Sequence, residues 1–440
     1  MNMIVGLKEG PMRWQQIAIV LLCIVIAMVD GYEVVAMPFS MSAIAADWSL
    51  PNSQVGYLLS AGIAGMALGA LFLAPLADHI GRRQHILMCL AIITVTMTLS
   101  GMTQGLWQLV IIRMIAGLFI GALIPSLNVI VSEYCSDKRR GLVMGLYGMG
   151  LPLGSALAGY AISPLIDAYS WRATFVFGGA LSLAVTLIAF VLLPESIDYV
   201  IHKRPANALT RYNRIARWLG FPEAATLPEP SADKIGQRSL SDLFRGKLLP
   251  RTLLLWAGFA CLSASFYFAN TWTAKIMADM TGDQHLGIQV AMLIQYGGVA
   301  GALIFGLLTL WLPPRTATAL LIGLGGVAFY LYAVNVTSVS VAMVIAVMVG
   351  MCANGGLAAY YTISPSIYPT MLRSTGVGLM IGVGRGFAIL GPIVTGFILA
   401  GSWTPVDVYK LFAGAMVVSA IATTGLILTF RHTEHVAKPA

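Results

Sequence analysis

Two acidic side chains stand close together in the first long apolar stretch of the sequence. They belong to the string Asp30-Gly31-Tyr32-Glu33, and their three-residue spacing places both carboxyl groups on one face of a helix. At about 1.5 Å per residue, Asp30 would lie about 24 Å along that helix from Trp14, beyond the midplane of a bilayer. Carboxyl groups are costly in lipid, so we expect both to face a central cavity and to carry protons. Alternatively, water at the outer rim solvates them, chiefly Glu33.

Two arginines interrupt other apolar stretches. Arg113 is followed by Gly117 and Gly121, which permit close helix approach, and Arg385 is flanked by three glycines that leave room beside it. A charged side chain inside a membrane must pair or face water, which makes both residues functional candidates. A guanidinium group binds a carboxylate through two parallel hydrogen bonds. The alternatives are a structural anchor between helices for Arg113, and an internal partner of Asp30 for Arg385.

Aromatic and amide side chains gather in the second half of the chain. Tyr267, Asn270, Gln295 and Tyr361 could stack against a ring and form hydrogen bonds with its substituents. We therefore expect them to bind the substrate. Aromatic residues in membrane helices also serve as packing or as an interfacial belt, and this alternative stays open for each of them.

A charged loop follows the second apolar stretch and reads Asp78-x-x-Gly81-Arg82-Arg83. A tight turn would use Gly81. Asp78, at a helix end, can pair with a basic group or with a helix N-terminus. This pattern indicates a conformational latch that breaks and re-forms between two helix bundles. The alternative is a basic anchor on the cytoplasmic side.

Several kinds of chemistry have no matching pattern in the sequence. There is no Gly-x-x-x-x-Gly-Lys-Ser/Thr string, so ATP hydrolysis is not expected to supply energy. The cysteines and histidines show no metal-ligand or redox spacing. We predict that the chain is not an enzyme, holds no metal and needs no cofactor. If energy is required, we expect a proton gradient to supply it.

The surroundings of these residues are strongly apolar. Of 440 residues, 58% are hydrophobic and only 10% are charged, so lipid is the expected solvent. A bilayer core takes roughly 20 apolar residues of helix. Twelve apolar runs satisfy this length and lie near 15–44, 54–77, 85–103, 107–132, 142–166, 172–194, 250–278, 285–311, 316–335, 340–364, 375–400 and 408–430.

The runs fall into two groups of six, separated by a polar, basic and proline-containing stretch. We therefore predict an N-terminal six-helix bundle at 1–194, a cytoplasmic central loop at 195–249 with short surface helices, and a C-terminal six-helix bundle at 250–440.

The positive charges predict the orientation. Most of the 26 lysines and arginines fall in loops on one side, while Arg172, Lys275 and Lys410 lie on the other. Because positive loops stay in the cytoplasm, both termini are expected there. The net charge of +8 is then a topology signal that requires no nucleic-acid partner.

Two of these strings resemble known transporters. The loop at 74–83 resembles the signature between the second and third helices of the major facilitator superfamily, although Ala74 and His79 depart from it. Asp30-Gly31-Tyr32-Glu33 resembles the Asp-Gly-Tyr/Phe-Asp hallmark of its aromatic acid:proton symporter family, with Glu33 in place of aspartate. Further similar strings include Ser132-Glu133-Tyr134, Trp171-Arg172, Tyr368-Pro369-Thr370 and Gly382-Val383-Gly384-Arg385-Gly386.

The resemblance implies an all-α membrane protein with two six-helix bundles around a midplane site. It also implies a monomer in a bacterial inner membrane. It implies proton-coupled import of a small aromatic carboxylate such as 4-hydroxybenzoate or protocatechuate. Arg385 would then hold the carboxylate, and Arg113 would assist proton transfer. The alternatives are muconate or another dicarboxylate, nicotinate, or proton-driven export.

Overall fold

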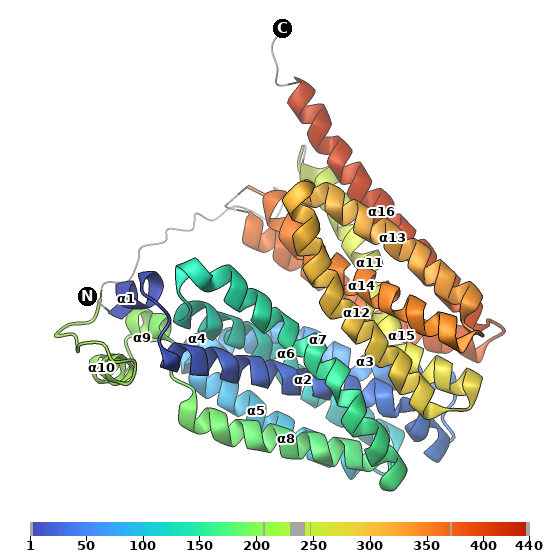
Figure 1. Cartoon of the computed structure of the whole chain (residues 1–440), viewed down its shortest axis with the longest axis horizontal. Helices are drawn as coiled ribbons and strands as arrows, with labels where there is room; N and C mark the ends of the chain where they lie inside the picture. The colour runs from blue at the N-terminus through green and yellow to red at the C-terminus, as the bar shows by residue number, and fades with distance from the viewer. Residues whose placement is uncertain (1–2, 206, 229–242, 247, 370–371, 437–440) are drawn as a thin grey trace. The chain divides into compact units, whose positions relative to one another are not determined.

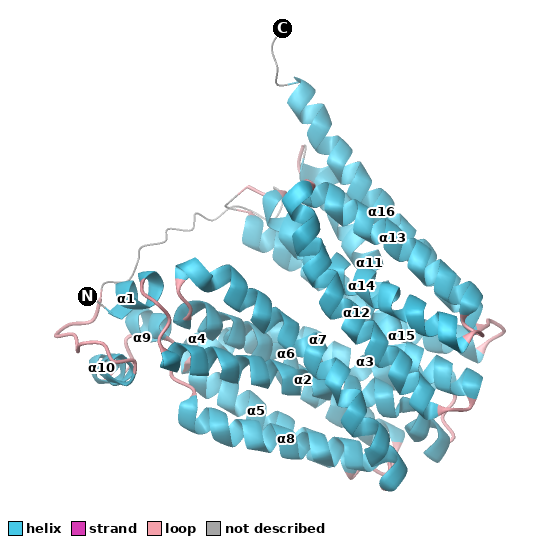
Figure 2. Ribbon diagram, in the orientation of Figure 1, coloured by secondary structure: helices cyan, strands magenta, loops and turns pink. Residues whose placement is uncertain are grey.

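A computed structural model describes residues 3–205, 207–228, 243–246, 248–369 and 372–436. Every described residue lies in a helix, a turn or a loop (Figure 2). In this part of the chain, twelve segments are long and apolar enough to cross a membrane, which confirms the predicted number. The helices that form them are α2 (Trp14–Asp47), α3 (Asn52–Leu68), α5 (Arg82–Gly101), α6 (Leu106–Tyr134), α7 (Arg140–Ala168), α8 (Trp171–Leu192), α11 (Leu248–Thr281), α12 (Gln284–Trp311), α13 (Pro314–Asn335), α14 (Val339–Ile363), α15 (Arg373–Ala400) and α16 (Pro405–Val436).

The second spanning segment, Asn52–Ile80, confirms the apolar run expected near 54–77, but its helix type changes in the second half. After α3 come a π-helical turn at Gly69–Leu73, a 3₁₀ turn at Ala74–Leu76 and the short helix α4 (Ala77–Ile80). Pro75 has no N–H group to donate within the helix. Nε2 of the buried His85 lies 3.1 Å from the carbonyl oxygen of Leu73, so a side chain takes part where the helix is irregular.

Short helices lie outside the spanning segments. The central stretch contains α9 (Ile197–Lys203) and α10 (Ala208–Trp218), which confirms the surface helices expected there. An additional helix, α1 (Met3–Glu9), was not predicted. On α10, Tyr212 and Ile215 are buried, whereas its three arginines are exposed, so this helix is strongly amphipathic.

The chain forms two compact units. Unit 1 contains Met1–Ala36, Ala64–Ala158 and Leu165–Asp233, and unit 2 contains Met37–Ile63, Gly159–Pro164 and Lys234–Ala440.

In unit 1, the helix that carries the two acids is held closely by its neighbours. The hydroxyl group of Ser155 on α7 donates a hydrogen bond of 2.8 Å to the carbonyl oxygen of Gly31 on α2. A Cβ atom at Gly31 would collide with the backbone of Leu151, so this glycine is required for the close approach. Figure 1 shows α5 beside α8 in the same unit, and these two helices are in contact.

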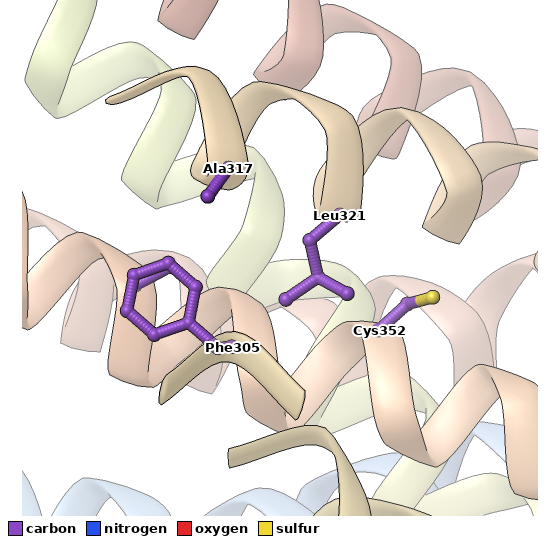
Figure 3. Close-up of a cluster of buried hydrophobic side chains, with 5 residues drawn as sticks. Phe305, Ala317, Leu321 and Cys352 are labelled. Carbon is purple, nitrogen blue, oxygen red and sulfur yellow. The ribbon is translucent and has the colours of Figure 1, made fainter. Parts of the chain in front are cut away.

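In unit 2, α12 packs against α14, α13 against α16, and α11 against α15. A buried apolar cluster joins α12, α13 and α14 (Figure 3), and its members are Phe305, Ala317, Leu321, Cys352 and Ala359. The packing leaves the other faces of these helices apolar and exposed, as expected for segments surrounded by lipid.

Two short segments from the first half of the sequence are part of unit 2. In the segment 37–63, the hydroxyl group of Ser60 donates a hydrogen bond of 2.9 Å to the carbonyl oxygen of Ile389 on α15. In the other, Oγ of Ser163 lies 2.5 Å from Nδ1 of His285 on α12. Polar contacts thus join these segments to helices of the second half.

Candidate functional site

The two acids on α2 are buried. Asp30 is 3% exposed and Glu33 is 2% exposed, so the alternative of a water-solvated position at the rim is wrong for this structure. Their burial follows from their positions on a helix that packs closely inside unit 1. The two carboxyl groups nevertheless have different surroundings.

Glu33 is held in place by α8. The hydroxyl group of Ser182 donates a hydrogen bond to its Oε1 atom. The neighbouring Tyr32 donates a hydrogen bond of 2.8 Å from its hydroxyl group to the carbonyl oxygen of Thr174, also on α8. These contacts give Glu33 a structural role beside any role in proton transfer.

Arg113 on α6 approaches the same turn of α2 from another side. Its Nη2 atom donates a hydrogen bond of 3.0 Å to the backbone carbonyl oxygen of Glu33, and Nη1 lies 2.9 Å from the sulfur of Met97. Its guanidinium carbon lies 5.6 Å from the centre of the Phe175 ring. Arg113 therefore anchors α6 to α2 through the backbone of the acidic string, as its structural alternative expects.

Asp30 lacks the hydrogen bonds that hold Glu33. Its Oδ1 atom is buried and has no hydrogen-bond partner among the residues that the structure describes. An unpaired carboxylate is far more costly to bury than a neutral carboxylic acid. Of the two acids, Asp30 is thus the one with a buried oxygen atom that receives no hydrogen bond from a described residue.

In unit 2, Arg385 lies beside two of the predicted aromatic residues. Its Nη1 atom donates a hydrogen bond of 2.7 Å to the hydroxyl group of Tyr267 on α11. Arg385, Tyr267 and Tyr361 line a small hollow together with Phe259 and Gly384. A Cβ atom at Gly384 would collide with the Phe259 ring, so the glycine lets α15 approach α11 here.

The volume of this hollow is about 20 Å³. That space holds about one water molecule. A carboxylate oxygen could take the place of such a water beside the guanidinium group, but an aromatic ring could not enter without movement. The hollow beside Arg385 therefore has room for one small polar group but not for a ring.

The two predicted amides lie apart from this hollow. Nε2 of Gln295 donates a hydrogen bond of 2.7 Å to Oδ1 of Asn270, and Nδ2 of Asn270 donates one of 2.7 Å to the carbonyl oxygen of Phe266. The structure thus brings Tyr267 and Tyr361 to Arg385 but pairs Asn270 with Gln295.

The charged loop after the second span is tied to other parts of unit 1. Gly81 has a φ angle of +97°, which favours glycine. Nη1 of Arg82 lies 2.6 Å from Oε1 of Glu133 on α6, whereas Nη2 lies 3.4 Å from Asp78, whose side chain is 62% exposed. The stronger ion pair of this loop therefore involves Glu133, a residue that was not among the predicted site residues.

Arg83 stabilises the end of α8. It donates from Nε to the carbonyl oxygen of Leu193 (2.7 Å) and from Nη2 to that of Phe190 (2.5 Å). Its backbone N–H donates to Oε1 of Glu195 (3.0 Å). Carbonyl groups at a helix C-terminus lack hydrogen-bond donors within the helix, and here the side chain of Arg83 supplies these donors.

Glu133 also accepts hydrogen bonds from the hydroxyl group of Ser196 (2.8 Å) and the backbone N–H of Ile197 (2.9 Å). We expect Glu133→Ala to lower the free energy of unfolding by about 3 kcal/mol, because it leaves buried donors and the Arg82 cation without this acceptor. Asp78→Ala should lower it by less than about 1 kcal/mol, because its ion pair is exposed. Thermal unfolding of the purified variants in detergent measures the difference, and equal melting temperatures would contradict it.

No group of three or more His, Cys, Asp or Glu side chains in the described ranges is arranged to hold a metal ion. The sequence prediction that no metal or other cofactor is required stays a prediction.

Comparison with known proteins gives consistent similarities. A sequence profile described as Major Facilitator Superfamily matches residues 20–353. The chain is 28% identical over 424 residues to the 4-hydroxybenzoate transporter PcaK of Pseudomonas putida, covering 96% of this chain and 94% of that protein. It is 28% identical over 399 residues to a gallate transporter of the same species, covering 90% and 88%.

A solved structure has a similar fold. It is the crystal structure of a bacterial homologue of the human lysosomal transporter Spinster in an inward-facing, occupied conformation. The TM-score is 0.72 at 18% sequence identity, with 96% of this chain and 98% of that chain covered. The all-α architecture expected from the sequence is therefore that of a known transporter fold.

Proposed function

The chain belongs to the major facilitator superfamily, and from this we propose that it is a proton-coupled symporter that imports a small aromatic carboxylate by alternating access. The substrate class is that of 4-hydroxybenzoate and protocatechuate. The protein is a multi-pass membrane transporter and not an enzyme. Within the proposal, it lies in a bacterial inner membrane with both termini in the cytoplasm, and it works as a monomer.

The observation that carries the substrate proposal is the setting of Arg385. Arg385 lines a hollow with room for one small polar group, and its Nη1 atom donates a hydrogen bond to the hydroxyl group of Tyr267. A guanidinium with its orientation fixed in advance binds a carboxylate with less loss of side-chain entropy. The names of the similar transporters, for 4-hydroxybenzoate and gallate, support an aromatic acid as the bearer of that carboxylate.

The proton is assigned to Asp30. It is the buried acid without a hydrogen-bond partner for Oδ1 among the described residues, whereas Glu33 is bonded to Ser182. In the proposed cycle, Asp30 takes up a proton from the periplasm and Arg385 captures the substrate. The transporter can close its cavity around charges that are neutralised. It resists closing around unpaired ions, because the desolvation of each ion costs several kcal/mol. Arg113, which contacts the backbone of Glu33, would assist the return of the proton.

Equilibrium competition tests the substrate class. Protocatechuate and benzoate should displace labelled 4-hydroxybenzoate from the purified protein. Muconate at the same concentrations should leave the labelled compound bound. Stronger displacement by muconate would replace the aromatic proposal with a dicarboxylate. Displacement by nicotinate alone would identify nicotinate as the preferred acid.

A further inference from the structure

A second and larger cavity lies in unit 1, away from the two acids on α2. Its volume is about 460 Å³. The first turn of α5, the end of α8 and the exposed face of α10 form its walls. None of the residues assigned to substrate or proton binding lines it, so it requires a separate explanation.

The cavity is rich in positive charge. Arg83, Arg211 and Arg214 line it, with Glu195 as its acidic residue. The guanidinium group of Arg83 is engaged by carbonyl oxygens of the α8 end, and the carboxylate of Glu195 accepts from the backbone N–H groups of Arg83 and Ser196. The side chains of Arg211 and Arg214 are exposed and form no hydrogen bond or ion pair with any described residue. Among the residues that the structure describes, no acidic group occupies these two cations, and they line the cavity where an anion could bind.

Part of the cavity lining is apolar. Val191 is 77% exposed and Leu192 is 43% exposed, and both line the cavity at the end of the spanning helix α8. Trp218 of α10 also lines it. Tryptophan is typical of the boundary between hydrocarbon and head groups. The cavity thus combines an apolar surface that continues a lipid-exposed helix with cations at its edge.

The helix that carries Arg211 and Arg214 is held in place by hydrogen bonds to the N-terminal part of the chain. Arg13 donates a hydrogen bond of 2.6 Å to the carbonyl oxygen of Leu219, and Gln15 donates one of 3.1 Å to that of Trp218. The apolar face of α10, including Ile215, is buried. The backbone that carries Arg211 and Arg214 is therefore held in place before an anion binds, and only their side chains have to be ordered on binding.

We propose that this cavity binds an anionic phospholipid, with its phosphate on Arg211 and Arg214 and an acyl chain along Val191 and Leu192. Arginine forms short, charge-assisted hydrogen bonds with phosphate oxygens. Basic pockets at the membrane surface bind acidic head groups. A zwitterionic lipid fits less well because its ammonium group would lie near the same arginines. Inorganic phosphate is also an anion, but it has no acyl chain that could pack against Val191 and Leu192.

Native mass spectrometry of the purified full-length protein tests this site. The probes are phosphatidylglycerol, phosphatidylcholine and inorganic phosphate. The variants are Arg211→Gln/Arg214→Gln and, as a control of equal charge, Lys203→Gln/Arg217→Gln, whose exposed side chains do not line the cavity. We expect the first variant to bind phosphatidylglycerol about tenfold more weakly than wild type, and the control to bind it normally.

Three results would overturn the proposal. They are equal phosphatidylglycerol binding by the Arg211→Gln/Arg214→Gln variant and wild type, equal binding of phosphatidylcholine, and displacement of the lipid by inorganic phosphate at equal concentration. A melting curve of each variant without added lipid shows whether it is folded. Binding is measured without transport, so failure of this proposal is distinguishable from failure of the proposed transport function.

Discussion

Arg385→Lys is expected to weaken the binding of 4-hydroxybenzoate by about tenfold to 150-fold. Lysine keeps the charge but loses the planar group that can hold a carboxylate with two bonds and Tyr267 with a third. The loss of one hydrogen bond to a charged group corresponds to about 1.5–3 kcal/mol. Titration of the purified variant with labelled substrate measures the dissociation constant.

Arg315→Lys is a matched control for this substitution. Arg315 also belongs to unit 2, but it lies at the start of α13, where its guanidinium carbon is 3.5 Å from the centre of the Phe430 ring. It does not line the hollow at Arg385. The control should bind substrate normally. Unchanged affinity of the Arg385→Lys variant would rule out recognition of the carboxylate by a guanidinium fork.

Asp30→Asn should abolish uphill accumulation of substrate, because an amide has nearly the same shape as the acid but cannot carry the coupling proton. Exchange of labelled for unlabelled substrate across the membrane should persist, since it requires no net proton movement. Uptake and counterflow in proteoliposomes measure the two activities separately. The matched control is Asp198→Asn, on the exposed surface of α9. Concentrative uptake by Asp30→Asn at the normal rate would exclude Asp30 as the proton site.

Much of the fold could be predicted from the sequence because lipid leaves few options. An apolar run of spanning length must form a helix to satisfy its backbone, so the number of spans and most of their ends follow from hydropathy. The change from α-helix to a π-helical turn after Leu68 did not follow from hydropathy, because Gly69–Leu73 is as apolar as the helix before it. Its geometry involves Pro75 and the side chain of His85, which reaches it from the next span.

The site was predictable only in part. The burial of Asp30 and Arg113 follows from charged residues in apolar helices, but the partners of such residues are tertiary contacts. Ser182, which holds Glu33, is 149 residues away in the sequence. Glu133 could have been suspected as an acid near the end of a span. Nothing in the sequence indicated that it, and not Asp78, forms the shorter ion pair with Arg82.

The central claim, proton-coupled import of an aromatic acid, is tested most directly by uptake of labelled 4-hydroxybenzoate into proteoliposomes with and without an inward proton gradient. Protocatechuate, benzoate, muconate and nicotinate serve as competitors. We predict concentrative uptake only with the gradient, inhibited by protocatechuate and benzoate and unaffected by muconate. Equal uptake with and without the proton gradient would contradict the claim. Inhibition of uptake by muconate alone would also contradict it.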